Sequence, residues 1–295
     1  MSPPHGEVAL AVDIGGSKLA AGLVDDQGRV IERRQVPTAS PGGEELFGLL
    51  VDLVRSVRGD GPVVVCGVGC GGPMEGDLVS PLNIAQWHRF PLRARLAEAL
   101  DLPVHVDNDA KALALGEGWL GAAAGHRDFI AMVVSTGVGG GIVLDGRLLD
   151  GALGNAGHIG HVIVVPGGHV CGCGARGCLE AEASGLHIAA TTGRPAAEAG
   201  PAVIDHVGTV VGRAVASVCN LLDLRLAVVA GSVALGFGAP FFAAAQAELD
   251  RCARLDFSRG AVVRPGGLGA AGPLVGAAAV GWRGLGREVL GQPQA

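Results

Sequence analysis

The chain has 295 residues, of which 49% are hydrophobic and 17% are charged. This length suits roughly two domains, and the apolar content is enough for buried cores, which excludes a disordered chain. The 28 acidic residues outnumber the 22 basic ones, and the formal net charge of -6 disfavours nucleic acid as the main partner. Many of the 51 glycines are expected in turns or where the backbone closely approaches another group.

Apolar runs alternate with helical patterns along the first part of the chain. Their continuous apolar character favours a largely parallel sheet. Strands are expected at 8–14, 20–25, 30–36, 63–68 and 104–106, and helices at 44–57, from Pro91 onward and at 110–120.

A second α/β domain is expected after residue 117, so the predicted domains are 1–117 and 118–295. Residues 150–185 have little periodicity and are expected to form a long loop, which is usually functional. Strands are expected at 129–135, 141–144 and 226–230, and helices at 201–222, 239–254 and in a last stretch that ends near Leu290.

Two uncharged stretches, 226–247 and 265–282, approach the length of a membrane span. Gly and Pro interrupt both, so short buried strands and helices explain them more simply. The start of the chain lacks the basic and apolar regions of a signal peptide, and the seven cysteines are an odd number. A reducing cytoplasm without membrane attachment is therefore expected.

Three glycine turns, at 13–18 (DIGGSK), 135–141 (STGVGGG) and 230–232 (AGS), each follow an apolar strand. Backbone N–H groups in such turns can approach phosphate oxygens, and an acid such as Asp13 can orient Mg²⁺ through water. Each turn alone is equally well explained as an ordinary sheet turn, but together they favour a bound nucleotide. The residues expected to face it are Asp13, Gly15, Gly16, Ser17, Lys18, Thr136, Gly137, Gly139, Gly231 and Ser232.

The run at 67–72 (GVGCGG) matches the glycine fingerprint of dinucleotide-binding proteins. Pro73 and Met74 follow it where a helix should start, and no acid lies between Asp77 and Glu98 to hold a ribose. A Gly-rich loop against a small polar substrate is expected instead.

Asp107, Asn108 and Asp109 lie where a predicted strand ends and a helix begins. Asp and Asn are favoured N-caps, so one of them is expected to cap the helix. Three such side chains exceed what a cap requires. The surplus could bind hydroxyl groups and include a general base.

His161 and the three cysteines at 171, 173 and 178 offer one imidazole and three thiols. These groups make a complete donor set for a structural Zn²⁺ with no open coordination position. Buried free cysteines or a disulfide are the alternative. His158, three residues before the imidazole, is either a satisfied loop residue or a substrate contact. The predicted zinc ligands are His161, Cys171, Cys173 and Cys178.

Taken in order, these motifs resemble the ROK family, which comprises repressors, open reading frames and kinases. The resemblance rests on DIGGSK at 13–18, STGVGGG at 135–141, and GHIGH at 157–161 continuing through CGCGARGCLE at 171–180. It covers essentially the whole chain. It implies the actin-like ATPase fold, with two ribonuclease-H-like α/β domains, a cleft between them, and the last helix packed back on the first domain.

Carried over by position, the resemblance implies an ATP-dependent hexose kinase in which Asp109 is the general base for the 6-hydroxyl of glucose or of a glucose-like amino sugar. ATP, Mg²⁺ and a structural Zn²⁺ are the implied cofactors, and a homodimer or homotetramer is the implied assembly. The implied sugar contacts are Gly72, Asn83, Asn108, Asp109, His161 and Glu180.

His158 stands where most glucokinases of the family have glutamate, in the pattern Gly-Glu-x-Gly-His. This form resembles bacterial N-acetylmannosamine kinases, so an N-acetylmannosamine kinase and a kinase of kanosamine (3-amino-3-deoxyglucose) are alternatives. A neutral imidazole offers one donor and one acceptor where a carboxylate offers only acceptors, which would change the recognition of sugar hydroxyls by His158.

A non-catalytic, sugar-sensing ROK regulator is the alternative from another functional class. Repressors of the family carry a helix-turn-helix before the first strand, and here only a few residues precede Glu7 and Val8. Together with the acidic net charge, this favours the kinase and disfavours binding to nucleic acid.

Overall fold

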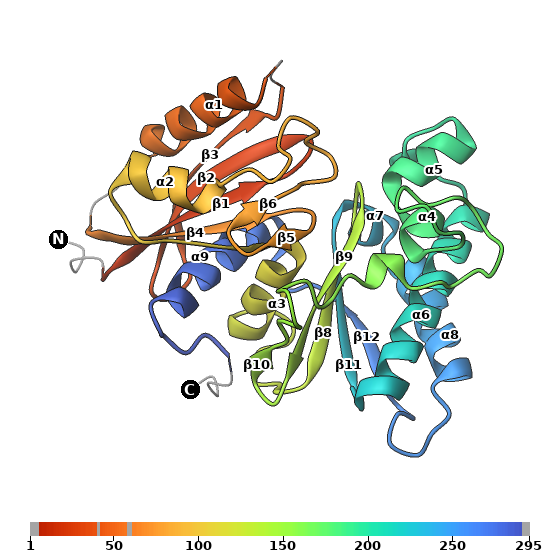
Figure 1. The fold of residues 1–295 in the computed structure, drawn as a ribbon. Helices are drawn as coiled ribbons and strands as arrows, with labels where there is room; N and C mark the ends of the chain where they lie inside the picture. Colours follow the sequence, from red (N-terminus) through yellow and green to blue (C-terminus); the bar gives the residue numbers. More distant parts are fainter. Residues whose placement is uncertain (1–5, 40–41, 58–60, 291–295) are drawn as a thin grey trace. The chain divides into compact units, whose positions relative to one another are not determined.

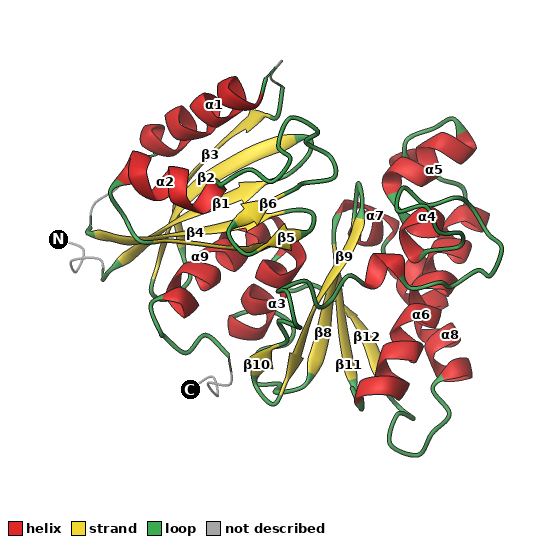
Figure 2. Cartoon of the chain, in the orientation of Figure 1, coloured by secondary structure: helices red, strands yellow, loops and turns green. Residues whose placement is uncertain are grey.

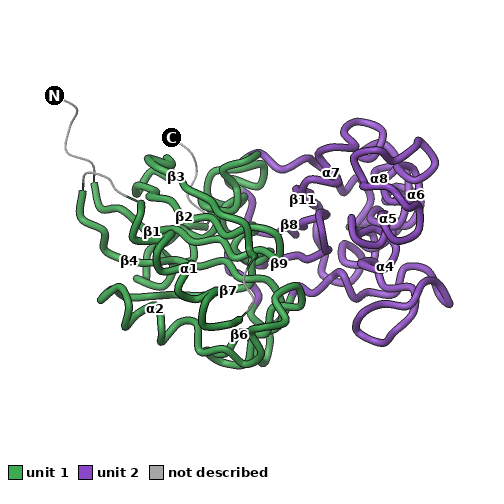
Figure 3. The backbone as a smooth tube through the Cα atoms, turned by 90° about the horizontal axis from the view of Figure 1, so that it is seen from above, with its two compact units in different colours: residues 1–125, 150–156, 268–295 green, residues 126–149, 157–267 purple. Residues whose placement is uncertain are grey.

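The computed structural model describes residues 6–39, 42–57 and 61–290. The chain forms two compact units, one made of residues 1–125, 150–156 and 268–295, the other of residues 126–149 and 157–267 (Figure 3). Each unit has its own hydrophobic core. The first unit extends past the expected boundary at residue 117 and takes in two later stretches of the chain.

A five-stranded sheet in the order β3-β2-β1-β4-β7 forms the centre of the first unit. β1, β4 and β7 run parallel, whereas β2 pairs antiparallel with both β1 and β3. The expectation of a largely parallel sheet is therefore corrected to a mixed one, because short turns join β1 to β2 and β2 to β3. The strands are β1 Val8–Ile14, β2 Lys18–Asp25, β3 Val30–Pro37, β4 Val63–Cys70 and β7 Val104–Asn108, with a small hairpin of β5 Met74–Glu75 and β6 Leu78–Val79.

Helices cover both faces of this sheet (Figure 1). α1 presents apolar residues including Leu46, Leu50 and Leu53 to the core. The last helix of the chain, α9, contacts β1, β4 and β7 and also α3, which places the C-terminal part of the chain in the first unit. The helices are α1 Gly43–Ser56, α2 Leu92–Leu100, α3 Asp109–Trp119 and α9 Gly272–Gly284, the last preceded by the 3-10 turn η3 Gly269–Ala271.

The second unit repeats the topology of the first. Its sheet has the order β10-β9-β8-β11-β12, in which β8, β11 and β12 are parallel and β9 pairs antiparallel with β8 and β10. β8 therefore corresponds to β1 and β11 to β4. The strands are β8 Phe129–Val134, β9 Val138–Leu144, β10 Arg147–Leu148, β11 Leu226–Ala230 and β12 Val262–Pro265.

Two long helices of the second unit, α6 and α8, pack closely because glycines face the neighbouring backbone. A Cβ at Gly212 of α6 would lie only 2.2 Å from the Ala245 carbonyl oxygen of α8. The stretch expected as a loop at 150–185 contains a 3-10 turn and a short helix (Figure 2). The helical elements are η1 Ile159–His161, α4 Leu179–Ala183, α5 Gly185–Thr192, η2 Ala196–Glu198, α6 Pro201–Leu222, α7 Ser232–Phe237 and α8 Ala239–Cys252.

Within the described residues, α6 alone has the length and hydropathy of a membrane span, but 56% of its apolar window is buried in the protein. Burial of this kind is typical of a core helix. The uncharged stretch at 226–247 divides into β11, α7 and part of α8, and the stretch at 265–282 ends in α9. α9 ends at Gly284, earlier than the expected end near Leu290.

Candidate functional site

The parallel strands β1, β4 and β7 end at one edge of the first unit's sheet. Ile14 in β1 pairs with Cys70 in β4, and Cys70 pairs with Asn108 in β7, so the loops that follow these strands start side by side. This edge therefore gathers the residues predicted in this unit: Asp13, Gly15, Gly16, Ser17, Lys18, Gly72, Asn83, Asn108 and Asp109.

Two carboxylates lie close together at this edge. The pKa of Asp13 is raised to about 7, mainly by burial and next by the negative charge of Asp109, while Lys18 opposes the shift. A hypothetical Cβ at Gly71 would lie 3.3 Å from Asp109 Oδ2, so this glycine leaves space beside that oxygen. A buried carboxylate with a raised pKa beside a second carboxylate suits a divalent cation, which supplies the missing positive charge.

Asn108 caps α3, which confirms the expected N-cap. Its Oδ1 accepts a hydrogen bond from the Ala110 N–H at 3.0 Å, and its Nδ2 donates to the Gly72 carbonyl at 3.2 Å. Asp109 Oδ1 also accepts from the Ala110 N–H, at 2.8 Å. These bonds fix the orientation of both side chains at the start of the helix.

The glycines of the first turn allow it to pack against Asn83. A Cβ at Gly16 would lie 2.4 Å from the Asn83 Cβ, so any larger residue would separate the two. The Gly15 N–H donates to the Lys18 carbonyl at 3.0 Å, which closes the turn between β1 and β2. Gly72 has φ +87° and faces the backbone of residues 80–82, so it also requires glycine.

Sequence reasoning missed a buried lysine that supports this edge. Lys111 is 2% exposed, and its Nζ lies 3.0 Å from Asp107 Oδ1, 2.8 Å from Asp150 Oδ1 and 3.1 Å from the Gly154 carbonyl oxygen. The spacing of Asp107 and Lys111, four residues apart across a strand end and a helix start, is the one signal in the sequence. The contact to Asp150 could not be read from it.

Asn155 connects the segment 150–156 to the β5–β6 hairpin of the first unit. Its Oδ1 accepts from the Met74 N–H at 2.9 Å, and its Nδ2 donates to the Met74 carbonyl at 2.8 Å. The segment 150–156 thereby holds the β5–β6 hairpin that follows the Gly-rich loop.

The second unit carries the corresponding glycine turn between β8 and β9. The turn spans Ser135, Thr136 and Gly137, whereas Gly139, expected in the turn, lies inside β9 opposite Val133. The Ser135 hydroxyl lies 2.9 Å from that of Ser232, which follows β11. The second and third predicted turns are thus neighbours.

Gly231 precedes Ser232 and has φ +101°, in the region that favours glycine. A Cβ there would lie 2.4 Å from the Val134 carbonyl oxygen. This close approach requires glycine at the end of β11.

Glu180, at the start of α4, lies against the turn between β8 and β9. Its Oε2 accepts from the Val138 N–H at 3.1 Å, and a Cβ at Gly137 would lie 3.0 Å from the same oxygen. His158 precedes η1, and its ring centroid lies 6.3 Å from that of His161, with the planes 18° apart. His161 in η1 and Glu180 in α4 thus lie on elements that contact β9, and His158 directly precedes η1.

The predicted zinc ligands converge. The His161 Nδ1 lies 3.6 Å from Cys171 Sγ, the Cys173 and Cys178 Sγ atoms are 3.7 Å apart, and all four donor atoms lie within 4.8 Å of one another. Zn–S bonds of about 2.3 Å and Zn–N bonds of about 2.1 Å give tetrahedral edges of about 3.6–3.8 Å. The donor distances therefore fit a zinc ion.

A disulfide does not explain this cluster, because its S–S bond would be about 2.05 Å long and all seven cysteines are free. Elsewhere, Cys66, Cys70 and Cys219 are buried in the two cores, as expected for small apolar residues, and Cys252 is partly buried.

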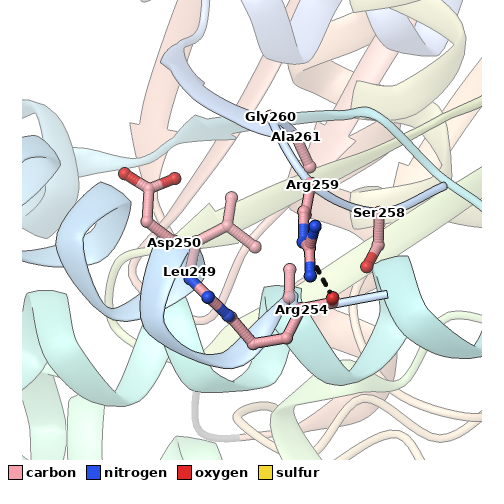
Figure 4. A pocket seen from close by; sticks show the side chains of 8 residues that line it. Leu249, Asp250, Arg254, Ser258, Arg259, Gly260 and Ala261 are labelled. Carbon is pink, nitrogen blue, oxygen red and sulfur yellow. Dashed lines mark hydrogen bonds between the residues drawn. The ribbon is translucent and has the colours of Figure 1, made fainter. Parts of the chain in front are cut away.

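A surface cavity of about 250 Å³ in the second unit lies beside the end of α8 (Figure 4). Arg254 and Arg259 line it, and the Arg259 Nε donates to the Arg254 carbonyl at 3.0 Å. None of the predicted site residues lines this cavity.

The model of the ROK family matches residues 9–282. The chain belongs to the ROK family. It is 41% identical over 247 residues to the N-acetylmannosamine kinase of Citrobacter koseri, a match that covers 78% of this chain and 84% of the relative.

Solved ROK structures have the same fold. The ROK family glucokinase of Streptomyces griseus, determined with glucose and AMPPNP, is 30% identical, with a TM-score of 0.83 over 94% of this chain and 99% of that chain. The ROK hexokinase of Thermus thermophilus is 33% identical, with a TM-score of 0.80 over 95% of this chain and 100% of that chain. These similarities confirm the actin-like ATPase fold and the sugar-kinase branch of the ROK family.

Proposed function

We propose that this ROK sugar kinase transfers the γ-phosphoryl group of ATP to the 6-hydroxyl of glucose or of a glucose-like amino sugar. The observation that carries the proposal is the position of Asp109. Its carboxylate lies at the sheet edge that also holds the first glycine turn and Asn83, and Gly71 leaves space beside Oδ2. A positioned carboxylate next to a phosphate-binding turn is what a sugar kinase requires.

The reaction follows from these groups. Asp109 accepts the proton of the sugar hydroxyl as its oxygen forms a bond to the γ-phosphorus, while the bond from phosphorus to the bridging oxygen breaks and ADP leaves. N–H groups of the turns at 16–18 and 136–137 would donate to the phosphoryl oxygens. Asp13 is the residue that would hold Mg²⁺, and the bound ion would neutralise charge on the phosphates.

Zinc is proposed to be structural and bound by His161, Cys171, Cys173 and Cys178. The support is the match between the donor distances and tetrahedral geometry. Since α4 begins directly after Cys178, the ion would fix the position of Glu180 without taking part in the transfer.

Replacing Asp109 tests the proposed base. Asp109→Asn keeps the shape of the side chain but cannot accept the proton, so we expect kcat to fall by about 10²–10⁴ while the sugar Kd changes little. A coupled assay for ADP release measures kcat, and calorimetry measures sugar binding. Full activity in Asp109→Asn would refute the role of Asp109. Sugar binding without ADP release in the unmodified protein would instead favour a sugar-sensing regulator.

We propose that His158 determines which sugar the enzyme prefers, because most glucokinases of the family have glutamate at this position. The similarity to N-acetylmannosamine kinases makes N-acetylmannosamine an alternative to glucose. Kanosamine is a further alternative. A panel of hexoses and aminohexoses assayed with His158→Glu is expected to shift relative kcat/KM toward glucose by at least tenfold, since a carboxylate accepts two hydrogen bonds from vicinal hydroxyls. Unchanged ratios would exclude His158 from substrate choice.

We expect the enzyme to act in the cytoplasm as a homodimer or homotetramer, as the ROK resemblance implies. Its small-molecule partners are the sugar and ATP. The acidic net charge continues to disfavour nucleic acid.

A further inference from the structure

Three histidines and a buried glutamate gather in the second unit, apart from the predicted zinc ligands. They come from four different segments: His169 from the loop that precedes Cys171, Glu182 from α4, His187 from α5 and His206 from α6. Neither the proposed kinase reaction nor the structural zinc uses these side chains.

One oxygen of Glu182 faces the histidines, and the other is already used. Glu182 Oε1 accepts from the His169 backbone N–H at 2.8 Å. Glu182 Oε2 lies 3.0 Å from His169 Nδ1 and 3.6 Å from His206 Nε2. Gly168 permits this arrangement, because a Cβ there would lie 2.3 Å from Glu182 Oε1.

His187 completes the cluster. Its ring centroid lies 4.3 Å from that of His169, and the ligand atoms of His169, Glu182 and His187 lie within 4.8 Å of one another. The Ser184 hydroxyl caps α5 by accepting from the His187 N–H at 3.1 Å, which fixes the backbone of this residue. For metal bonds of about 2.1 Å, neighbouring ligand atoms are about 3.0–3.4 Å apart, close to the Glu182–His169 distance.

The cluster lines a surface cavity of about 210 Å³. The Glu182 side chain is 2% exposed, whereas those of His169 and His206 are 55% and 50% exposed. An ion can therefore enter from solvent, and the imidazoles can turn toward it. A carboxylate oxygen held among imidazole nitrogens is a donor set of the kind that borderline divalent metals prefer.

We propose that His169, Glu182, His187 and His206 form a second metal site, which binds a divalent transition ion of the Zn²⁺, Co²⁺ and Ni²⁺ class. This ion would join α4, α5 and α6 to the loop that carries Cys171. Through Glu182 it would also stabilise α4, the helix that bears Glu180 and that begins directly after the predicted zinc ligand Cys178. The site is independent of the proposed kinase activity, because none of its ligands belongs to the predicted sugar or nucleotide residues.

A Co²⁺ titration of the zinc-loaded enzyme tests the site. We expect one further equivalent to bind and to give visible d–d absorption without the near-ultraviolet thiolate-to-cobalt band, since no cysteine belongs to the second site. Metal analysis after dialysis should then show one zinc and one cobalt per chain. The double variant His187→Asn/His206→Asn is expected to bind this cobalt at least tenfold more weakly and to retain the zinc.

His126→Asn is the matched control, because His126 is an exposed histidine of the same unit outside the cluster, and it should bind cobalt as the unmodified protein does. The single variant His206→Asn, altered at a half-exposed side chain, provides the test if the double variant does not fold. Absence of a second equivalent, equal cobalt binding by the variants, or a thiolate-to-cobalt band would each overturn the proposal. The last result would mean that cobalt had entered the cysteine site.

Discussion

Asp13 is a residue whose charge the ligand-free fold disfavours. Its pKa in the folded protein is raised from 3.8 to about 7, first by burial and next by the charge of Asp109. Between these two pH values the folded chain retains a proton that the unfolded chain has lost. The stability that Asp13 contributes is therefore full below about pH 4 and is lost as the pH rises toward 7.

Asp13→Asn is expected to stabilise the ligand-free protein at pH 8 while reducing its activity. A pKa difference of about three units sets an upper limit of about 4 kcal/mol on the gain in free energy of unfolding. The gain should shrink as the pH is lowered toward 4. Urea unfolding at several pH values measures it, with Asp52→Asn, at an exposed position on α1, as control. Equal stability of Asp13→Asn and the unmodified protein at pH 8 would contradict the assignment.

The buried Lys111 illustrates what a residue type alone cannot reveal. In the sequence it is one charge on a predicted helix, whereas in the fold its ammonium group joins Asp107 to Asp150 across 43 positions of the chain. An ion pair of this kind is strongly destabilised when one partner is removed, because a buried charge remains. We expect it to affect function through the position of the junction between β7 and α3, where Asn108 and Asp109 lie.

At the scale of elements, the packing of α9 on β4 determines the meaning of one glycine. Gly67 begins the run that resembles a dinucleotide fingerprint. In the structure a Cβ at this position would lie 1.9 Å from the Ala277 carbonyl oxygen and 2.6 Å from the Gly281 nitrogen. Gly67 is therefore required because α9 packs on β4 at this position. Its presence needs no bound phosphate as an explanation.

Gly67→Ala is expected to lower the free energy of unfolding by about 1–3 kcal/mol, because the methyl group meets backbone that cannot rotate away. Gly48→Ala in α1 is the matched control. Nothing lies within 4 Å of a Cβ at Gly48, so the same change should stabilise the protein by up to about 1 kcal/mol. Urea unfolding midpoints compare the two variants. Similar midpoints would show that α9 does not press on β4.

At the scale of the whole chain, one topology occurs twice, and the predicted phosphate-binding turns occupy equivalent places in it. The turn after β1 corresponds to the turn after β8, and the loop after β4 corresponds to the one after β11. Parallel strands expose their carboxyl ends at one edge, where backbone N–H groups and short polar side chains are free to bind ligands. The two units then diverge: the first carries Asp13 and Asp109, and the second carries the loop with the predicted zinc ligands.

Local chemistry explains which features the sequence predicted. The strand at 8–14, the helix at 201–222 and the strand at 226–230 agree with the structure because their apolar patterns are set within a few residues. The convergence of the candidate zinc ligands could be expected because Cys171, Cys173 and Cys178 are close neighbours in the chain. The extent of the second glycine turn was overestimated, because Gly139 pairs in β9 and a glycine can belong to either element.

The sequence by itself determined the glycine turns, the Asn108 cap at the start of α3 and the candidate metal ligands, since each depends on residues close together in the chain. Only the tertiary structure decided that α9 returns to the first unit, that Lys111 reaches Asp150, and that four separate segments bring His169, Glu182, His187 and His206 together. The physical reason is that these contacts depend on side-chain packing between distant segments, which leaves no periodic pattern in the sequence.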